Sequence, residues 1–206
     1  MINTRNIVRQ DEIDLFKKVW DNDQDRKFSD WYGSSDQSEI TMERIEILPN
    51  SKEYDIITGI VKKIRPEATQ VWSAYQRQLK PHNIHLDTLD GLTETMIIPL
   101  NHDPLAKVLV WSQKFSSVEE FQEFLIEWGS LDNEPINPNL HNEYDIDHTR
   151  DPNNGKFLAE YLNLVGDFSY NLGTINHFPG HNLHCSSDWT KIPGMKFKEL
   201  VVIHTN

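Results

Sequence analysis

The stretch PHNIHLDTLD, Pro81 to Asp90, places two histidines and two aspartates in a segment that otherwise predicts a β-strand. Side chains alternate across a strand, so His85 and Asp87 are predicted to point to the same face. One imidazole beside one carboxylate supplies two of the three protein ligands of a facial metal site. The segment therefore predicts a ligand-bearing strand in a β-fold that must bring a third ligand to it.

The third ligand is expected from a strand that is distant in the sequence. The segment FPGHNLHCSSDW offers His184, with His181 as a weaker candidate because it lies nearer to the Pro-Gly turn. Two histidines and one carboxylate leave three positions open on non-haem Fe(II), where a co-substrate and dioxygen bind. His-x-Asp alone also arises by chance in acidic proteins, where it marks only a half-exposed strand.

Short strands dominate the chain around this segment. Runs of branched and aromatic residues, separated by Pro, Gly, Asn or Asp, predict eight strands: 44–48, 70–78, 83–89, 93–100, 106–115, 167–172, 182–187 and 198–205. Apolar residues at helical spacing predict three helices: 11–20, 54–65 and 116–129. Seven or eight short strands with few helices indicate a β-sandwich or barrel of the jelly-roll type, mainly β with flanking helices.

The length of 206 residues suits a single domain. Within it, residues 1–70 are predicted to form an N-terminal helical support. Residues 71–206 are predicted to form the β-core, interrupted by a helical and loop insertion at 116–160. The polar stretch 130–156 is longer than most loops, which predicts either a lid over a site or a mobile insertion.

Composition excludes several classes of function. A net charge of −12 leaves no basic surface for nucleic acid, and no run of about 18 apolar residues predicts a membrane span. The N-terminus lacks the apolar core of a signal peptide, so a cytoplasmic protein is expected. The lone cysteine, Cys185, excludes a thiolate metal cluster within one chain and is expected to be a small buried side chain. Any metal must therefore be held by nitrogen and oxygen.

The order of motifs adds a family resemblance to this interpretation. His-x-Asp is followed by the strand TMIIPLN, then by the FPG turn, a histidine and a basic final strand. This order resembles the 2-oxoglutarate and Fe(II)-dependent dioxygenases, especially their prolyl-hydroxylase-like and phage or marine microbial members. The resemblance extends from Val71 to Asn206. It implies a double-stranded β-helix, the cupin-like jelly roll, with Fe(II) bound by His85, Asp87 and His184.

The resemblance also implies an activity and a co-substrate. Enzymes of this family decarboxylate 2-oxoglutarate to succinate and hydroxylate a substrate, here expected to be a small molecule or a peptide. A basic residue of the last strand normally pairs with the distal carboxylate of 2-oxoglutarate. This chain offers lysines there instead of the commoner arginine. Lys198 is expected to fill the role, because Lys196 lies at the fraying end of the strand.

The remaining candidates have simpler interpretations. Asp145, Asp147 and His148 form a rival metal set, but in a stretch without strand pattern. The other histidines are expected on the surface, in turns or, for His204, near the chain end and uninvolved. Aromatic residues at strand positions 72, 75 and 111 are expected in the core more often than in a pocket. Two alternatives to an oxygenase stay open: a cupin-like protein that binds zinc or another metal, and a non-catalytic, lectin-like jelly roll.

Overall fold

The computed structural model describes residues 2–22, 27–30, 40–87, 91–129, 134–146 and 158–206. Its helices are α1 (Gln10–Asn22), α2 (Lys52–Ile64), α3 (Val118–Gly129), α4 (Leu140–Glu143) and α5 (Leu158–Tyr161). Its strands are β1 (Asn3–Asn6), β2 (Phe28–Asp30), β3 (Met42–Glu46), β4 (Val71–Gln78), β5 (Glu94–Pro99), β6 (Asp103–Lys114), β7 (Leu164–Tyr170), β8 (Thr174–Pro179), β9 (Asn182–Ser186) and β10 (Lys198–Thr205). None of the described helices is both long and apolar enough to cross a membrane.

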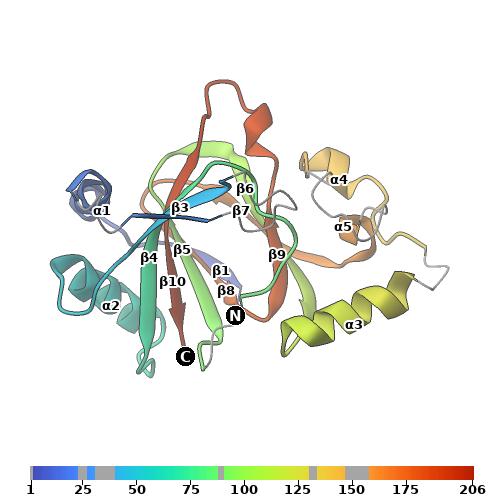
Figure 1. Ribbon diagram of the computed structural model, residues 1–206, viewed down its shortest axis with the longest axis horizontal. Coiled ribbons are helices and arrows are strands. Elements are labelled where there is room, and N and C mark those ends of the chain that lie inside the picture. The colour runs from blue at the N-terminus through green and yellow to red at the C-terminus, as the bar shows by residue number, and fades with distance from the viewer. Residues whose placement is uncertain (1, 23–26, 31–39, 88–90, 130–133, 147–157) are drawn as a thin grey trace.

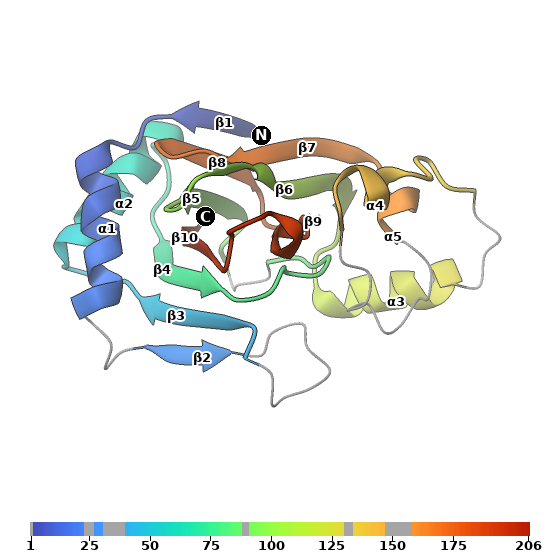
Figure 2. The same cartoon turned by 90° about the horizontal axis from the view of Figure 1, so that it is seen from above.

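The strands form two antiparallel sheets. The larger has seven strands in the order β1-β8-β5-β10-β4-β3-β2, and the smaller has three in the order β7-β6-β9. Figure 1 shows the two sheets with helices at both ends of the molecule, α1 and α2 beside the larger sheet and α3 to α5 beside β9. Figure 2 shows the same separation from above. This architecture confirms the predicted mainly-β jelly roll with flanking helices.

Strand alternation sorts the apolar side chains into three clusters. On β10, Leu200 and Val202 pack between the sheets, whereas Val201 and Ile203 pack on the outer face with α1 and α2. On β9, Leu183 and Cys185 face outward and pack in a cluster with side chains from α3, α4 and α5. Both faces of each sheet are therefore covered, and the even-numbered residues of β9 and β10 are left to line the interior.

Three differences from the predicted elements bear on the site. Residues 83–87 form no strand and contact β9 through one isolated bridge, His85 to His184. Strand β8 was not among the predicted strands; His177 therefore lies in a strand rather than a loop. The short elements β1, β2, α4 and α5 were also missed, since three or four residues carry too little pattern.

Candidate metal centre

The backbone around β9 brings the predicted ligands together. β9 is an edge strand of the smaller sheet, so its outer backbone groups are open to a further partner. His85 and His184 use them to exchange two backbone hydrogen bonds of 2.9 Å. Two residues later, the Asp87 amide donates to the Gly180 carbonyl at 3.0 Å. The predicted alternation of His85 and Asp87 thus survives in a chain that is extended but too irregular to form a strand.

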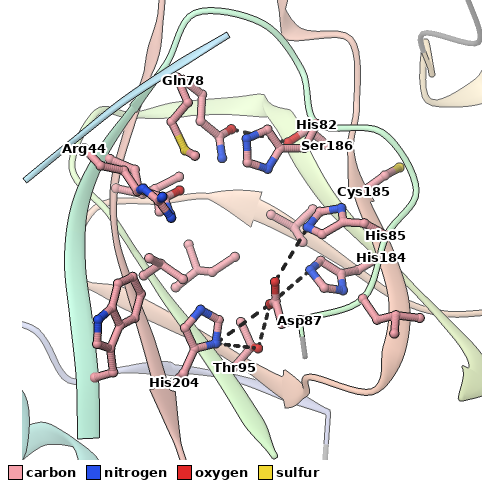
Figure 3. Close-up of a pocket in the computed structure, with 18 of the residues that line it drawn as sticks. Arg44, Gln78, His82, His85, Asp87, Thr95, His184, Cys185, Ser186 and His204 are labelled. Atoms are coloured by element: carbon pink, nitrogen blue, oxygen red, sulfur yellow. Dashed lines mark hydrogen bonds and ion pairs between the residues drawn. The ribbon is translucent and has the colours of Figure 1, made fainter. Parts of the chain in front are cut away.

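Side chains of His85, Asp87 and His184 converge on one point, as Figure 3 shows. Their potential ligand atoms all lie within 4.8 Å of one another. Nε2 of His184 lies 3.2 Å from Oδ2 of Asp87, and Nε2 of His85 lies 3.7 Å from Oδ1. His181, the weaker candidate, is not in the group, and its Nδ1 lies 3.0 Å from the Phe115 carbonyl.

Backbone carbonyls fix which nitrogen of each ring faces the centre. Nδ1 of His85 lies 2.7 Å from the Asn83 carbonyl, and Nδ1 of His184 lies 2.9 Å from the Asn182 carbonyl. A carbonyl only accepts, so each Nδ1 carries a proton, and each ring presents the lone pair of Nε2 when it is neutral. Two lone pairs and a carboxylate directed at one point suit a divalent cation, and this is the arrangement in which histidine ligands are usually held.

Electrostatics agree with a neutral His85 and an ionised Asp87, and without a metal they favour the protonated ring at His184. Burial lowers the pKa of His85 to about 4, with the charge of His184 adding to the effect. Burial opposes ionisation of Asp87, but His184, His204 and His85 outweigh it and hold the carboxyl pKa well below its usual range. His184 has a raised pKa, because the attraction of Asp87 exceeds the effect of burial. The carboxylate is therefore anionic and His85 is neutral at physiological pH.

His204 lies in the site, contrary to the expectation that it would be uninvolved. Thr95 donates from Oγ1 to Oδ2 of Asp87 at 2.8 Å, and Nδ1 of His204 lies 3.2 Å from the same hydroxyl. Because the carboxylate only accepts, the hydroxyl proton goes to Asp87 and the Thr95 oxygen accepts from His204. The His204 ring is in turn stacked on the Trp72 ring, with ring centroids 5.4 Å apart. Asp87 is thus held by side chains from β5 and β10.

A cavity of about 330 Å³ opens beside the triad. Its walls come from both sheets and include apolar side chains, among them Ile97, Val108, Leu200 and Val202. Its polar lining beyond the triad includes Arg44, Gln76, Gln78, His82, Thr95, Ser186 and His204. His82 was expected on the surface, but the missing strand removes the alternation that placed it there. Trp72 lines the cavity, whereas Tyr75 and Trp111 are buried on the outer faces.

Lys198 is fully buried between the sheets. Its Nζ donates to Oγ of Ser186 at 2.7 Å and lies 4.2 Å from the centre of the Tyr170 ring. Both partners line the cavity, and the Tyr170 hydroxyl is buried without a hydrogen-bond partner among the described residues. No carboxylate of the described chain pairs with this ammonium, and burial lowers the pKa of Lys198 to about 7. Lys196 is exposed and precedes β10.

The described parts of the rival metal set and of the suggested lid make contacts elsewhere. Asp145 pairs with Lys191 at 3.2 Å, while Asp147 and His148 lie outside the described residues. Of the polar stretch 130–156, the structure describes 134–146, and none of the side chains described at 134–140 and 143–146 lines the cavity. Leu140 and Ile146 instead pack into the cluster outside the smaller sheet.

Of the site residues that the sequence analysis missed, His204 had a signal in the sequence. Lys198, Leu200, Val202 and His204 occupy alternate positions of one strand, so the parity that places Lys198 inside also places His204 inside. Arg44 and Thr95 are different, because a lone polar residue on a predicted strand carries no sign of which sheet face is the interior. Their inward direction follows only from the pairing of β3 with β4 and of β5 with β10.

Replacing Thr95 by valine is expected to weaken divalent metal binding by about 10-fold or more, because Asp87 loses the hydroxyl that orients it. Thr95→Ser should restore the affinity. Thr205→Val is the matched control, since the Thr205 hydroxyl is also bonded inside the larger sheet but donates to the Gln70 carbonyl. Metal titration followed by calorimetry measures the effect, and wild-type affinity in Thr95→Val would contradict it.

Comparison with known proteins identifies the fold. The sequence matches no protein-family model and no curated protein. Among solved structures, a prolyl-4-hydroxylase from Pseudomonas putida superposes with a TM-score of 0.58 at 9% identity, covering 100% of this chain and 91% of that one. SnoK, a non-haem alpha-ketoglutarate-dependent carbocyclase from nogalamycin biosynthesis, superposes with a TM-score of 0.59 at 12% identity, covering 97% of this chain and 76% of that one.

HygX from Streptomyces hygroscopicus, solved with nickel and 2-oxoglutarate, gives a TM-score of 0.55 at 10% identity over 100% of this chain and 82% of that one. The fold implied by the motif resemblance is thus confirmed by structures that match 97% or more of this chain. At these identities the likeness concerns architecture, and it agrees with the two sheets and their covering helices. The chain has the jelly-roll fold of 2-oxoglutarate and Fe(II)-dependent oxygenases.

Proposed function

We propose that the protein is a dioxygenase that uses Fe(II) and 2-oxoglutarate and hydroxylates a small-molecule or peptide substrate. The observation that carries this proposal is the convergence of His85, Asp87 and His184 at a cavity inside a jelly roll. Two neutral imidazoles and one carboxylate are the ligand set of mononuclear non-haem Fe(II) oxygenases. When bound, the iron would supply oxidative chemistry that converts 2-oxoglutarate and dioxygen into succinate, carbon dioxide and a hydroxylated product.

The chain itself would hold and orient the iron. His85 and His184 would bind through Nε2, because their Nδ1 atoms donate to backbone carbonyls. Asp87 would supply the one negative charge, with Thr95 holding its carboxylate in place. Three protein ligands leave room for a bidentate co-substrate and dioxygen, which a closed four-ligand zinc site would not.

Lys198 is proposed to bind the distal carboxylate of 2-oxoglutarate. Its partner Ser186 lies two residues after His184 on the same face of β9, so the two positions are about 7 Å apart. A five-carbon diacid that chelates a metal at His184 can span this distance. The Lys198 ammonium, the Ser186 hydroxyl and the unpartnered Tyr170 hydroxyl then offer three donors to one carboxylate.

The solved structures of similar fold support the choice of co-substrate and metal. HygX was solved with nickel, 2-oxoglutarate and hygromycin B, and SnoN with Fe3+, alpha-ketoglutarate and nogalamycin RO. These ligands support a small-molecule substrate here. The cavity of about 330 Å³ is at the lower end of the usual range for ligand pockets, so a small substrate or a single inserted side chain fits better than a large one.

The proposal is tested by reconstituting metal-free protein with Fe(II) under nitrogen and then adding 2-oxoglutarate and air. Slow succinate formation without added substrate is expected in the wild type and not in Asp87→Ala. Replacing Fe(II) by zinc should abolish succinate formation, because zinc has no redox chemistry. Tight zinc binding together with no succinate from the iron-loaded protein would instead favour a cupin-like binding protein.

A further inference from the structure

Arg44 is directed into the cavity by the pairing of β3. In the register of β3 with β4, Arg44 lies opposite Gln76 and Met42 lies opposite Gln78, and all four line the cavity. Ile45, the residue that follows Arg44 on β3, packs on the outer face with α1 and α2. Figure 3 shows the Arg44 side chain entering the cavity from the β3 side.

Arg44 belongs to the same wall as His204. The positive charge of Arg44 acts on the His204 ring, whose stacking partner Trp72 also lines the cavity. His204 in turn lies 4.0 Å from Oδ2 of Asp87. A group bound by Arg44 would therefore lie on the wall that leads directly to the metal centre.

The proposed metal and co-substrate sites make no use of Arg44. The three metal ligands are complete without it, and the donors for 2-oxoglutarate gather around Ser186, which Figure 3 shows on the other side of the cavity from Arg44. Among the described lining residues, Arg44 is the one side chain that is a cation at every physiological pH. The net charge of −12 makes this local cation a departure from the acidic character of the whole chain.

We propose that Arg44 binds an anionic group of the substrate, so that the enzyme acts on a small carboxylate or phosphate rather than on a neutral molecule. The inference rests on the proposed function. A guanidinium forms paired, planar hydrogen bonds with carboxylate and phosphate oxygens, and these bonds strengthen where water is partly excluded. Trp72 provides a flat apolar face beside the bound anion.

Calorimetry on protein loaded with Fe(II) and saturating 2-oxoglutarate under nitrogen tests the inference, because the Lys198 site is then filled. Benzoate and phenyl phosphate are the anionic probes, and benzamide is the neutral probe of the same shape. At least one anion is expected to bind the wild type more tightly than benzamide does. The substitution Arg44→Gln should lower the affinity for that anion at least 10-fold and leave the affinity for benzamide unchanged. The preferred anion separates a carboxylate substrate from a phosphate substrate.

Arg77→Gln is the matched control. Arg77 lies on the neighbouring strand β4 but points to the outer face, where it pairs with Glu199 at 2.6 Å, so anion binding should be unaffected. Anion affinity that is unchanged in Arg44→Gln, or no preference for an anion in the wild type, would overturn the inference. So would a weaker affinity of Arg44→Gln for 2-oxoglutarate alone, since Arg44 would then bind the co-substrate. Failure of the wild type to bind Fe(II) and 2-oxoglutarate in the loading step would instead reject the proposed function.

Discussion

Replacing Asp87 by alanine is expected to lower the affinity for Fe(II) by at least about 100-fold, a larger loss than outer-shell changes produce. Asp87 supplies the one anionic ligand of the proposed site, while His85 and His184 bind as neutral rings. The variant should also lose the thermal stabilisation that metal gives the wild type, which amounts to about 2.7 kcal/mol at a metal concentration 100 times the dissociation constant. Calorimetric titration and thermal unfolding with and without metal measure the two effects.

Glu94→Gln provides the control for this experiment. Glu94 also pairs with a buried histidine, His177, at 2.8 Å, but lies on the outer face of the larger sheet away from the cavity. It should alter stability without altering metal affinity. An Asp87→Ala variant that binds Fe(II) as the wild type does would remove the basis of the proposed metal centre.

The sequence carried enough information for the fold because its long strands have a clear pattern. Segments 71–78, 94–99 and 198–205 alternate or run apolar over six or more residues, and each is a central strand of the larger sheet. The helices at 10–22 and 52–64 show the same strength of signal at helical spacing. Elements of three or four residues, such as β1 and α4, are stabilised by tertiary packing, which no local pattern reports.

The prediction of His85, Asp87 and His184 depended partly on strand alternation and partly on the order of motifs in the sequence. Alternation correctly placed His85 and Asp87 on one side, although the segment is held by one bridge and by the Asp87–Gly180 hydrogen bond and not by a strand ladder. The choice of His184 over His181 depended on its distance from the turn and on the motif order. Backbone pairing between His85 and His184 is a long-range contact, and a single sequence does not encode such a contact in any local pattern.

The cavity wall formed by Arg44 and His204 was not predicted from the sequence. A polar residue on a strand is normally interpreted as facing solvent, because burying an unpaired polar group costs free energy. Here, however, the two sheets enclose a cavity, and inward-facing polar residues line it. Parity assigns residues to one of two faces, but only the paired sheets show which face is the cavity.

Replacing Lys198 by methionine is expected to raise the 2-oxoglutarate concentration needed for half-maximal succinate formation by about 30-fold or more, the effect of removing one partner of a buried charge pair. Metal affinity should be unchanged, because Lys198 contacts Ser186 and Tyr170 and none of the three metal ligands. Lys196→Met is the matched control, since Lys196 is exposed and precedes the strand. Equal, small effects of the two substitutions would show that the carboxylate binds elsewhere.

The buried charge of Lys198 is expected to lower the stability of the folded protein and to strengthen the binding of 2-oxoglutarate. Burial lowers its pKa from the usual value near 10.5 to about 7, so the folded protein binds this proton more weakly than the unfolded chain does. The unfolding free energy attributable to Lys198 therefore rises with pH between about 7 and 10.5 and is lowest below 7. Without co-substrate at neutral pH, Lys198→Met should be as stable as the wild type or more stable, by up to roughly 1–4 kcal/mol.

Binding a carboxylate favours the charged lysine, so 2-oxoglutarate should raise the Lys198 pKa and take up a proton when it binds above pH 7. The dissociation constant of 2-oxoglutarate is then expected to be constant below about pH 7 and to rise by up to about 10-fold per pH unit above it. Calorimetry in two buffers of different ionisation enthalpy measures the proton uptake directly. A Lys198→Met variant that keeps the wild-type pH dependence would assign that proton, and with it the carboxylate contact, to another residue.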